Sequence, residues 1–167
     1  MPKLRDLETV DADYVTTGPN ANEMTQAINK PAAAVFRALE DGPAWKEWLG
    51  MTVEWTSPEP FGVGTTRTVT GNGQTIEEYF LEWEDGERMR FRFDRATLPV
   101  SAFAEDWSVR PTGDDTCEVS WKYAYEWDGP LPGVLGTGFG KFFEFNGKRS
   151  LRKLAAFMEN TDRFDEG

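Results

Sequence analysis

The sequence predicts an α+β fold in which a curved antiparallel sheet wraps around one long C-terminal helix. The helix is predicted at residues 138–159, where apolar side chains recur every three or four positions and form one apolar face. The sheet is predicted over residues 51–127, where apolar and polar side chains alternate between turn sequences. A chain of 167 residues suits one domain with a single core, which this helix would cover.

Two short helices are predicted between the first strand and the rest of the sheet. Residues 24–28 form that strand, and Pro31 then occupies a favoured first position for a helix over residues 32–39. A second short helix follows a Gly-Pro break and carries Trp45 and Trp48 on one side. We expect these two tryptophans to close one end of the fold.

The remaining strands are bounded by clear turn signals. Asn72-Gly73 is typical of a two-residue type I′ hairpin turn, and Asp85-Gly86 marks the next turn. The Gly- and Pro-rich loop 128–137 leads into the long helix. Six strands are predicted, at residues 52–56, 64–70, 75–84, 88–93, 101–110 and 116–127.

The domain is predicted to span residues 23–160. Residues 1–22 are polar and acidic, and we interpret them as a loosely attached N-terminal arm with a short strand at residues 13–17. Residues 161–167 form an acidic C-terminal tail.

The turns also fix which residues face one another across the hairpins. The predicted pairs are Arg67 with Glu78, Phe80 with Phe91, Glu78 with Phe93, Val109 with Cys117, Trp107 with Val119, Glu105 with Trp121 and Phe103 with Tyr123. All three hairpins then place their large apolar residues on one face, the core side. That face comprises Val69, Ile76, Phe80, Met89, Phe91, Phe93, Phe103, Trp107, Val109, Val119, Trp121, Tyr123 and Tyr125.

Three charged residues fall on the same inward face: Arg67, Glu78 and Glu105. A buried charge costs several kcal/mol unless it is paired and hydrogen-bonded. Arg67 and Glu78 are opposite in sign and directly opposite in register. The pattern indicates either a polar patch inside a cavity or an ion pair that only fixes strand register.

The long helix divides into two parts by composition. Its second half should pack against the sheet through Leu151, Leu154, Ala155 and Met158. Its first half combines phenylalanines with glycines, which suggests a wall that leaves space. We expect the cavity and its entrance to be lined by Phe139, Phe143, Asn146 and Gly147.

Composition excludes several classes of function. The formal charge of −11 disfavours binding to nucleic acid and to anionic membranes. The chain has no histidine and one cysteine, so it cannot form a Ser-His-Asp or Cys-His site, a His-ligated zinc site or an internal disulfide. We expect no metal and no cofactor. The single cysteine and the charged N-terminus favour a cytoplasmic location, without membrane insertion.

Several segments resemble the START-like superfamily (SRPBCC), which includes polyketide cyclases/dehydratases and lipid-transport proteins and has the helix-grip fold. The segments are KPAAAVFRALEDGPAWKEWL at 30–49, GTTRTV at 64–69, the return strand with Ile76-Glu77-Glu78 and Glu82-Trp83, and SLRKLAAFM at 150–158. The resemblance covers about residues 24–159. It implies a curved sheet that grips the long helix around a deep apolar cavity, with the acidic residue at Glu78 on the cavity wall.

The resemblance also separates this chain from the hormone receptors of the superfamily. Those receptors hold the ligand carboxylate with a lysine on the second strand, whereas residues 51–57 here contain no Lys or Arg. Their gate motif is also missing, because residues 71–74 form only a minimal turn.

The leading hypothesis is a protein that binds a hydrophobic small molecule, such as a lipid, a sterol or an aromatic polyketide-like compound, in an internal cavity between sheet and helix. The predicted lining comprises Arg67, Glu78, Phe80, Phe91, Phe93, Phe103, Glu105, Trp107, Trp121, Tyr123, Tyr125, Phe139, Phe143, Asn146 and Gly147. An apolar wall with a few convergent polar groups is the usual composition of a ligand pocket.

Two alternatives stay open at the level of the sequence. The first is a cyclase/dehydratase-like or hydrolase-like enzyme that uses Glu105 as acid or base, with Arg67 and Tyr123 holding a carbonyl or enolate oxygen. The second is a co-chaperone-like interaction module. The sequence leaves open whether the protein is a monomer or a homodimer.

Overall fold

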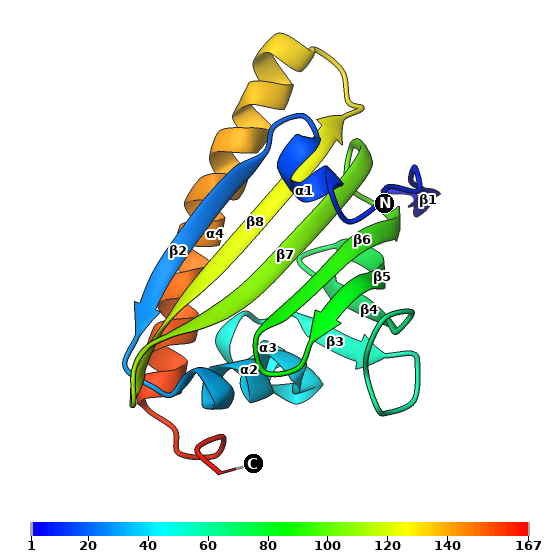
Figure 1. Cartoon of the computed structure of the whole chain (residues 1–167). Helices are drawn as coiled ribbons and strands as arrows, with labels where there is room; N and C mark the ends of the chain where they lie inside the picture. The colour runs from blue at the N-terminus through cyan, green and yellow to red at the C-terminus, as the bar shows by residue number, and fades with distance from the viewer. Residues whose placement is uncertain (1, 167) are drawn as a thin grey trace.

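The computed structural model describes residues 2–166 and has the predicted α+β architecture (Figure 1). The sheet is antiparallel with the strand order β2-β8-β7-β6-β5-β4-β3, and β1 pairs with β6 beside this path. The strands are β1 (Arg5–Asp6), β2 (Asn22–Ile28), β3 (Thr52–Trp55), β4 (Thr66–Gly71), β5 (Gln74–Glu84), β6 (Arg88–Ala96), β7 (Val100–Gly113) and β8 (Thr116–Trp127). The helices are α1 (Tyr14–Thr17), α2 (Ala32–Glu40), α3 (Gly42–Trp48), the π-helical turn η1 (Pro132–Gly136) and α4 (Thr137–Glu159).

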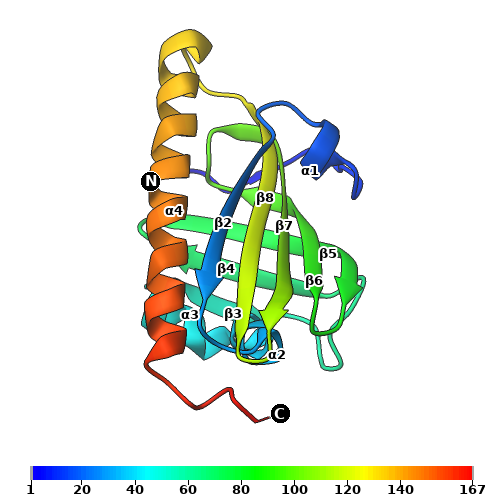
Figure 2. The ribbon, with the colours of Figure 1, turned by 60° about the vertical axis from the view of Figure 1, so that its left-hand side comes forward.

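The sheet curves around α4 in the manner of a helix-grip fold. Figure 2 shows α4 standing along one side of the sheet, while α2 and α3 close the lower end. Trp45 and Trp48 are only 5% and 4% exposed, which confirms that α3 buries them. No helix in the described part of the chain is long and apolar enough to cross a membrane.

The register predicted for the first two hairpins is confirmed. Asn72 and Gly73 both have positive φ, as a type I′ turn requires, and this turn sets Arg67 opposite Glu78. Across the next turn, Phe80 lies opposite Phe91 and Glu78 opposite Phe93, although a bulge follows Phe80. Every residue of the predicted core face is buried except Ile76, which is partly buried.

The predicted register of the last hairpin is wrong by two residues. Glu105 pairs with Tyr123 rather than Trp121, and Trp107 pairs with Trp121 rather than Val119. Phe103 likewise pairs with Tyr125 and Val109 with Val119. The turn between Gly113 and Thr116 lies later than predicted, which alone shifts the register by three residues. A bulge after Pro111 takes one of these back, so the net shift is two. An even shift keeps the same side chains on the inner face.

The N-terminal arm also differs from the prediction. Residues 14–17 form one helical turn, α1, rather than a strand, because Thr16 and Thr17 bond back to the Asp13 carbonyl. Further upstream, the backbone N–H of Leu7 bonds to β6 at 2.9 Å, and that of Glu8 bonds to β7 at 2.8 Å.

Arginines on the outer face of β6 are paired with acids of the neighbouring strands. Arg90 bonds to Asp106 at 2.8 Å and to the Ala12 carbonyl of the arm at 3.1 Å. Arg88 lies 3.5 Å from Asp106 and from Glu84. The positive charges of these two arginines are therefore largely neutralised by acidic side chains of the same molecule.

The two halves of α4 differ in packing as their composition predicts. Leu151, Leu154 and Met158 in the second half are at most 1% exposed. In the first half Phe142 and Phe145 are 68% and 64% exposed, and in Figure 2 this half rises beyond the end of the sheet. The first half is therefore the less constrained part of the helix.

Candidate functional site

A buried ion pair lies at the centre of the inner face. Arg67 on β4 and Glu78 on β5 are directly opposite, and the Arg67 Nε donates a hydrogen bond to the Glu78 carboxylate. Their side chains are 1% and 5% exposed. Burial raises the pKa of Glu78, while the Arg67 guanidinium opposes this shift.

Four aromatic rings surround the Arg67 guanidinium. Its central carbon lies 4.9 to 5.2 Å from the ring centres of Trp45, Trp55, Phe80 and Phe91. Such cation–π contacts compensate part of the lost hydration. Arg67 Nη1 is buried and has no hydrogen-bond partner among residues 2–166. One strong donor in the interior is thus free to bind an oxygen atom.

Glu105 on β7 is the third inward charge of the site. It pairs with Phe91 of β6, the ring that also contacts Arg67. The side chain is 7% exposed and accepts a 2.9 Å hydrogen bond from Trp107 Nε1. Burial, and then the Glu78 charge, raise the pKa of Glu105 to about 8, although the Trp107 bond and Arg67 lower it. Glu105 is therefore mostly a neutral, protonated acid at pH 7.

The corrected register brings Tyr123 next to Glu105, because the two residues face each other across β7 and β8. Arg67, the third residue predicted to act with them, is buried on the same face but lies on β4, three strands from Glu105. The Tyr123 hydroxyl accepts a 3.0 Å hydrogen bond from Asn22 Nδ2. Burial raises the pKa of Tyr123, so its hydroxyl keeps a proton that it can donate.

Asn22, Trp45 and Trp55 were not among the predicted site residues. Asn22 opens β2 and faces Tyr123 on the neighbouring β8, but the first strand was predicted to begin two residues later. Trp45 comes from α3, whose packing does not follow from hairpin registers, and Trp55 lies opposite Arg67 on β3, which a long loop joins to β4. The alternating Thr52–Trp55 pattern was the available signal for Trp55.

An aromatic wall continues from this cluster toward the first half of α4. Phe93 stacks on Phe103 with ring centres 4.4 Å apart, and Phe103 stacks on Tyr125 with ring centres 5.5 Å apart. From the helix, the ring centre of Phe143 lies 4.7 Å from that of Tyr123, and the ring centre of Phe139 lies 5.2 Å from that of Tyr125. The predicted lining aromatics therefore meet across the space between sheet and helix.

The predicted polar and small residues of α4 have other contacts. The Asn146 side chain donates to the Phe142 carbonyl within the helix at 2.9 Å. Gly147 is buried, and a Cβ at this position would lie 2.4 Å from Met24 Cε. This glycine therefore allows α4 to approach β2 closely and does not leave space in a cavity. It marks the beginning of the tightly packed half of the helix.

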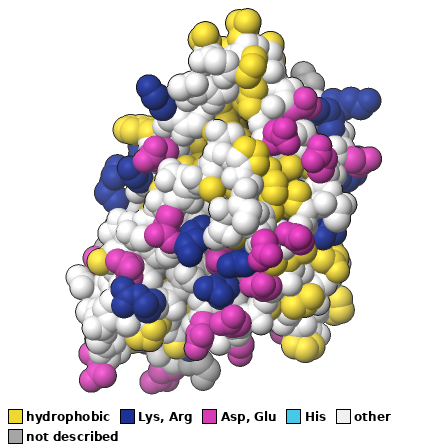
Figure 3. Space-filling model, turned by 45° about the horizontal axis from the view of Figure 1, so that its top comes forward, with side chains coloured by type: hydrophobic (Ala, Val, Ile, Leu, Met, Phe, Trp, Pro, Cys, Tyr) yellow, Lys and Arg dark blue, Asp and Glu magenta, His cyan; other side chains and the backbone are white. Residues whose placement is uncertain are grey.

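An opening lies beside the aromatic wall. A hollow of about 460 Å³ separates the residues before β2 from the first turns of α4, and it is lined by Asn22, Tyr123, Tyr125, Gly140 and Glu144 among others. The loop that contains η1 and the first half of α4 also carry the exposed large apolar side chains of this end of the molecule: Leu131, Val134, Leu135, Phe142 and Phe145. Figure 3 shows hydrophobic side chains gathered at this end of the molecule.

Comparison with known proteins shows to which family the chain belongs. The sequence profile of the family described as polyketide cyclase / dehydrase and lipid transport matches residues 22–159. The chain belongs to this family. A full-length relative is an uncharacterized protein of Mycobacterium tuberculosis strain H37Rv, which is 35% identical over 158 residues, covering 91% of this chain and 92% of the relative.

Solved structures share the fold of this family member. The di-domain ARO/CYC BexL from the BE-7585A biosynthetic pathway superposes with a TM-score of 0.69 at 21% identity, over 83% of this chain and 46% of that longer chain. The protein TTHA0849 from Thermus thermophilus gives 0.68 at 22% identity, over 83% and 97% of the two chains. A START superfamily protein from Mycobacterium smegmatis gives 0.67 at 10% identity, over 81% and 97%.

Proposed function

We propose that this protein binds a hydrophobic small molecule of the lipid, sterol or aromatic polyketide type between the sheet and the first half of α4. The observation that carries the proposal is the free Arg67 Nη1 at the base of an aromatic wall. A ligand with an apolar body and an oxygen at one end would satisfy that donor. Desolvated donors left without a partner cost about 1–3 kcal/mol, so an acceptor should bind there favourably.

The hollow beside Tyr125 is the proposed entrance. A Cβ on Gly140 would lie 2.7 Å from the Tyr125 hydroxyl, whereas a Cβ on Gly138 would meet no atom within 4 Å. Gly140→Leu should therefore narrow the entrance, and Gly138→Leu is the matched control on the same helix.

The test is uptake of a fluorescent fatty acid by the purified protein, followed by native mass spectrometry of a solvent-extracted and reloaded sample. We expect one bound molecule in the wild type and the Gly138→Leu variant, with a clear loss of uptake in Gly140→Leu. Equal uptake by both variants would contradict the entrance, and no uptake of lipid, sterol or aromatic probes would contradict the binding function.

A second candidate function is catalysis, and the neutral state of Glu105 favours it. In a dehydration, Glu105 would give its proton to a departing hydroxyl, which leaves as water, and would take back the proton released from the adjacent carbon. Arg67 Nη1 and the Tyr123 hydroxyl would stabilise the negative charge that develops on a carbonyl oxygen. Glu105→Gln should then abolish turnover while ligand binding persists, and wild-type turnover in this variant would remove the assignment.

A further inference from the structure

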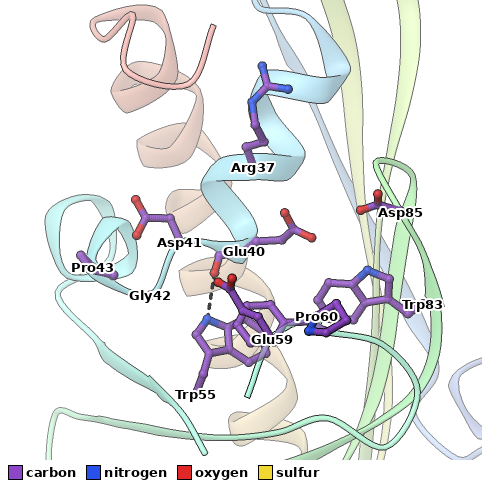
Figure 4. Close-up of a pocket in the computed structure, with 11 residues that line it drawn as sticks. Arg37, Glu40, Asp41, Gly42, Pro43, Trp55, Glu59, Pro60, Trp83 and Asp85 are labelled. Carbon is purple, nitrogen blue, oxygen red and sulfur yellow. Dashed lines mark hydrogen bonds between the residues drawn. The ribbon is translucent and has the colours of Figure 1, made fainter. Parts of the chain in front are cut away.

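A second hollow lies between α2, the loop after β3 and the turn that joins β5 to β6 (Figure 4). Its volume is about 710 Å³. Different elements supply its walls: Glu40 ends α2, Trp55 ends β3, and Asp85 lies in the β5–β6 turn. None of the residues proposed to contact the hydrophobic ligand lines this hollow.

Three aromatic rings form one wall of the hollow. Phe61 stacks on Trp55 with ring centres 4.1 Å apart, and Trp83 lies 6.1 Å from both rings. The Trp55 indole N–H donates a 2.8 Å hydrogen bond to the Glu40 carbonyl, drawn as a dashed line in Figure 4. This bond fixes the ring at the edge of the hollow. Aromatic side chains thus form part of the lining of the hollow.

Three carboxylates that form no ion pair within the described chain border the same space. Glu40, Glu59 and Asp85 form no ion pair with any residue of the described chain, 2–166. In Figure 4 the Glu40 side chain extends toward the side on which Asp85 lies. Burial, then Asp85 and Glu59, raise the pKa of Glu40 to about 7, while Arg37 lowers it. Their negative charges therefore act on one another across the hollow.

Arg37, which also borders the hollow, directs its guanidinium to a neutral acceptor, so its positive charge offsets one of the carboxylates. The guanidinium of Arg37 donates to the Phe164 carbonyl through Nε at 2.9 Å and also through Nη2. The fourth carboxylate at the border, Asp41, lies 3.5 Å from Arg163. The three carboxylates without ion pairs thus leave the hollow negatively charged.

The spacing of these acids disfavours a metal ion. Within residues 2–166, no group of three or more acidic or cysteine side chains is close enough to hold one. A larger cation can meet separated carboxylates and still contact aromatic faces, which attract ammonium groups within about 6 Å. We propose that this hollow is a binding site for an organic ammonium cation, held against Trp55, Phe61 and Trp83 and neutralised by Glu40, Glu59 and Asp85.

The proposal is independent of the hydrophobic ligand and is tested with two probes of the same shape. Acetylcholine carries a trimethylammonium group, and 3,3-dimethylbutyl acetate is its neutral isostere. Titrations followed by tryptophan fluorescence and by NMR should show saturable binding of acetylcholine and at least about tenfold weaker binding of the isostere. Equal binding of both probes would overturn the proposal, as would displacement of acetylcholine by millimolar Mg²⁺ beyond the effect of ionic strength.

Variants locate the site on the chain. Glu40→Gln with Asp85→Asn should weaken acetylcholine binding about tenfold, because each partly exposed charge pair is worth up to about 1 kcal/mol. Trp83→Leu should weaken it about fivefold through loss of a ring. Glu126→Gln, at the far end of β8, removes a distant acidic charge as a control and should leave affinity unchanged. Circular dichroism checks that each variant is folded, and wild-type affinity in the folded double variant would overturn the assignment.

Discussion

The indole N–H of Trp107 donates a hydrogen bond to the carboxyl group of Glu105, two residues earlier on β7. Hydrogen bonds to a carboxylate favour its charged form, but burial and the nearby Glu78 charge outweigh this one. A protonated acid therefore sits beside a permanently charged arginine. The two groups differ in how they respond to pH, and this difference can be measured.

The protonated state of Glu105 should make stability depend on pH. Its pKa rises from 4.5 in the unfolded chain to about 8 in the folded protein, so the folded state holds a proton that the unfolded state releases. The free energy of unfolding should therefore fall as pH rises from 5 to 9, by roughly 4 kcal/mol from this group. Urea denaturation of wild type and Glu105→Gln at both pH values isolates the effect. Parallel pH profiles for the two proteins would contradict it.

Removal of Arg67 alone should destabilise the fold strongly. Arg67→Leu leaves Glu78 buried without its cation, and an uncompensated buried charge costs about 3–5 kcal/mol. The double variant Arg67→Leu, Glu78→Leu should recover most of that loss, since neither charge remains. Chemical denaturation of both single variants and the double variant gives the coupling energy. Additive losses would show that the pair is not coupled.

Gly147 and Gly138 should respond oppositely to larger side chains. Gly147→Leu forces new atoms against Met24 and Trp121, so we expect a loss of about 1–3 kcal/mol. Gly138→Ala meets no atom within 4 Å and should stabilise by up to about 1 kcal/mol through helix propensity. Thermal unfolding distinguishes them, and a stabilising Gly147→Leu would contradict the close approach of α4 to β2.

Hydrogen exchange should divide α4 at about Gly147. Few buried contacts hold the first half, whereas Leu151, Leu154 and Met158 anchor the second. Backbone amides before Gly147 should therefore exchange through local opening, and those after it should approach the protection of the sheet. Exchange measured by mass spectrometry would show two rates, and saturation with a bound fatty acid should slow the first half selectively. Uniform protection along α4 would contradict this division.

Local rules predicted the sheet well because two-residue turns determine both position and register. Asn72-Gly73 alone sets Arg67 opposite Glu78, and alternation then determines which side chains face inward. The register of the last hairpin was mispredicted because its turn lies later than the sequence indicated and a bulge follows Pro111. The net shift of two residues is even, so the apolar alternation does not reveal it. The neighbour of Glu105 was consequently mispredicted, although its burial was not.

Contacts between distant elements could not be obtained from the sequence. Trp45 reaches Arg67 because α3 packs against β3, which hairpin rules do not describe. Trp55 lies opposite Arg67 in the β3–β4 pair, but the loop between these strands is too long for turn rules to set their register. The acidic hollow likewise combines the end of α2 with two separate loops. Neither Glu40 nor Asp85 stands out in a chain with 29 acidic residues.

Trp55 contacts Arg67 in the interior and Phe61 in the acidic hollow. A single indole, fixed by its bond to the Glu40 carbonyl, thus contacts the internal cation and also lines the acidic hollow. The fluorescence of this residue should consequently report on both compartments, so that one native side chain serves as a probe of two occupancies.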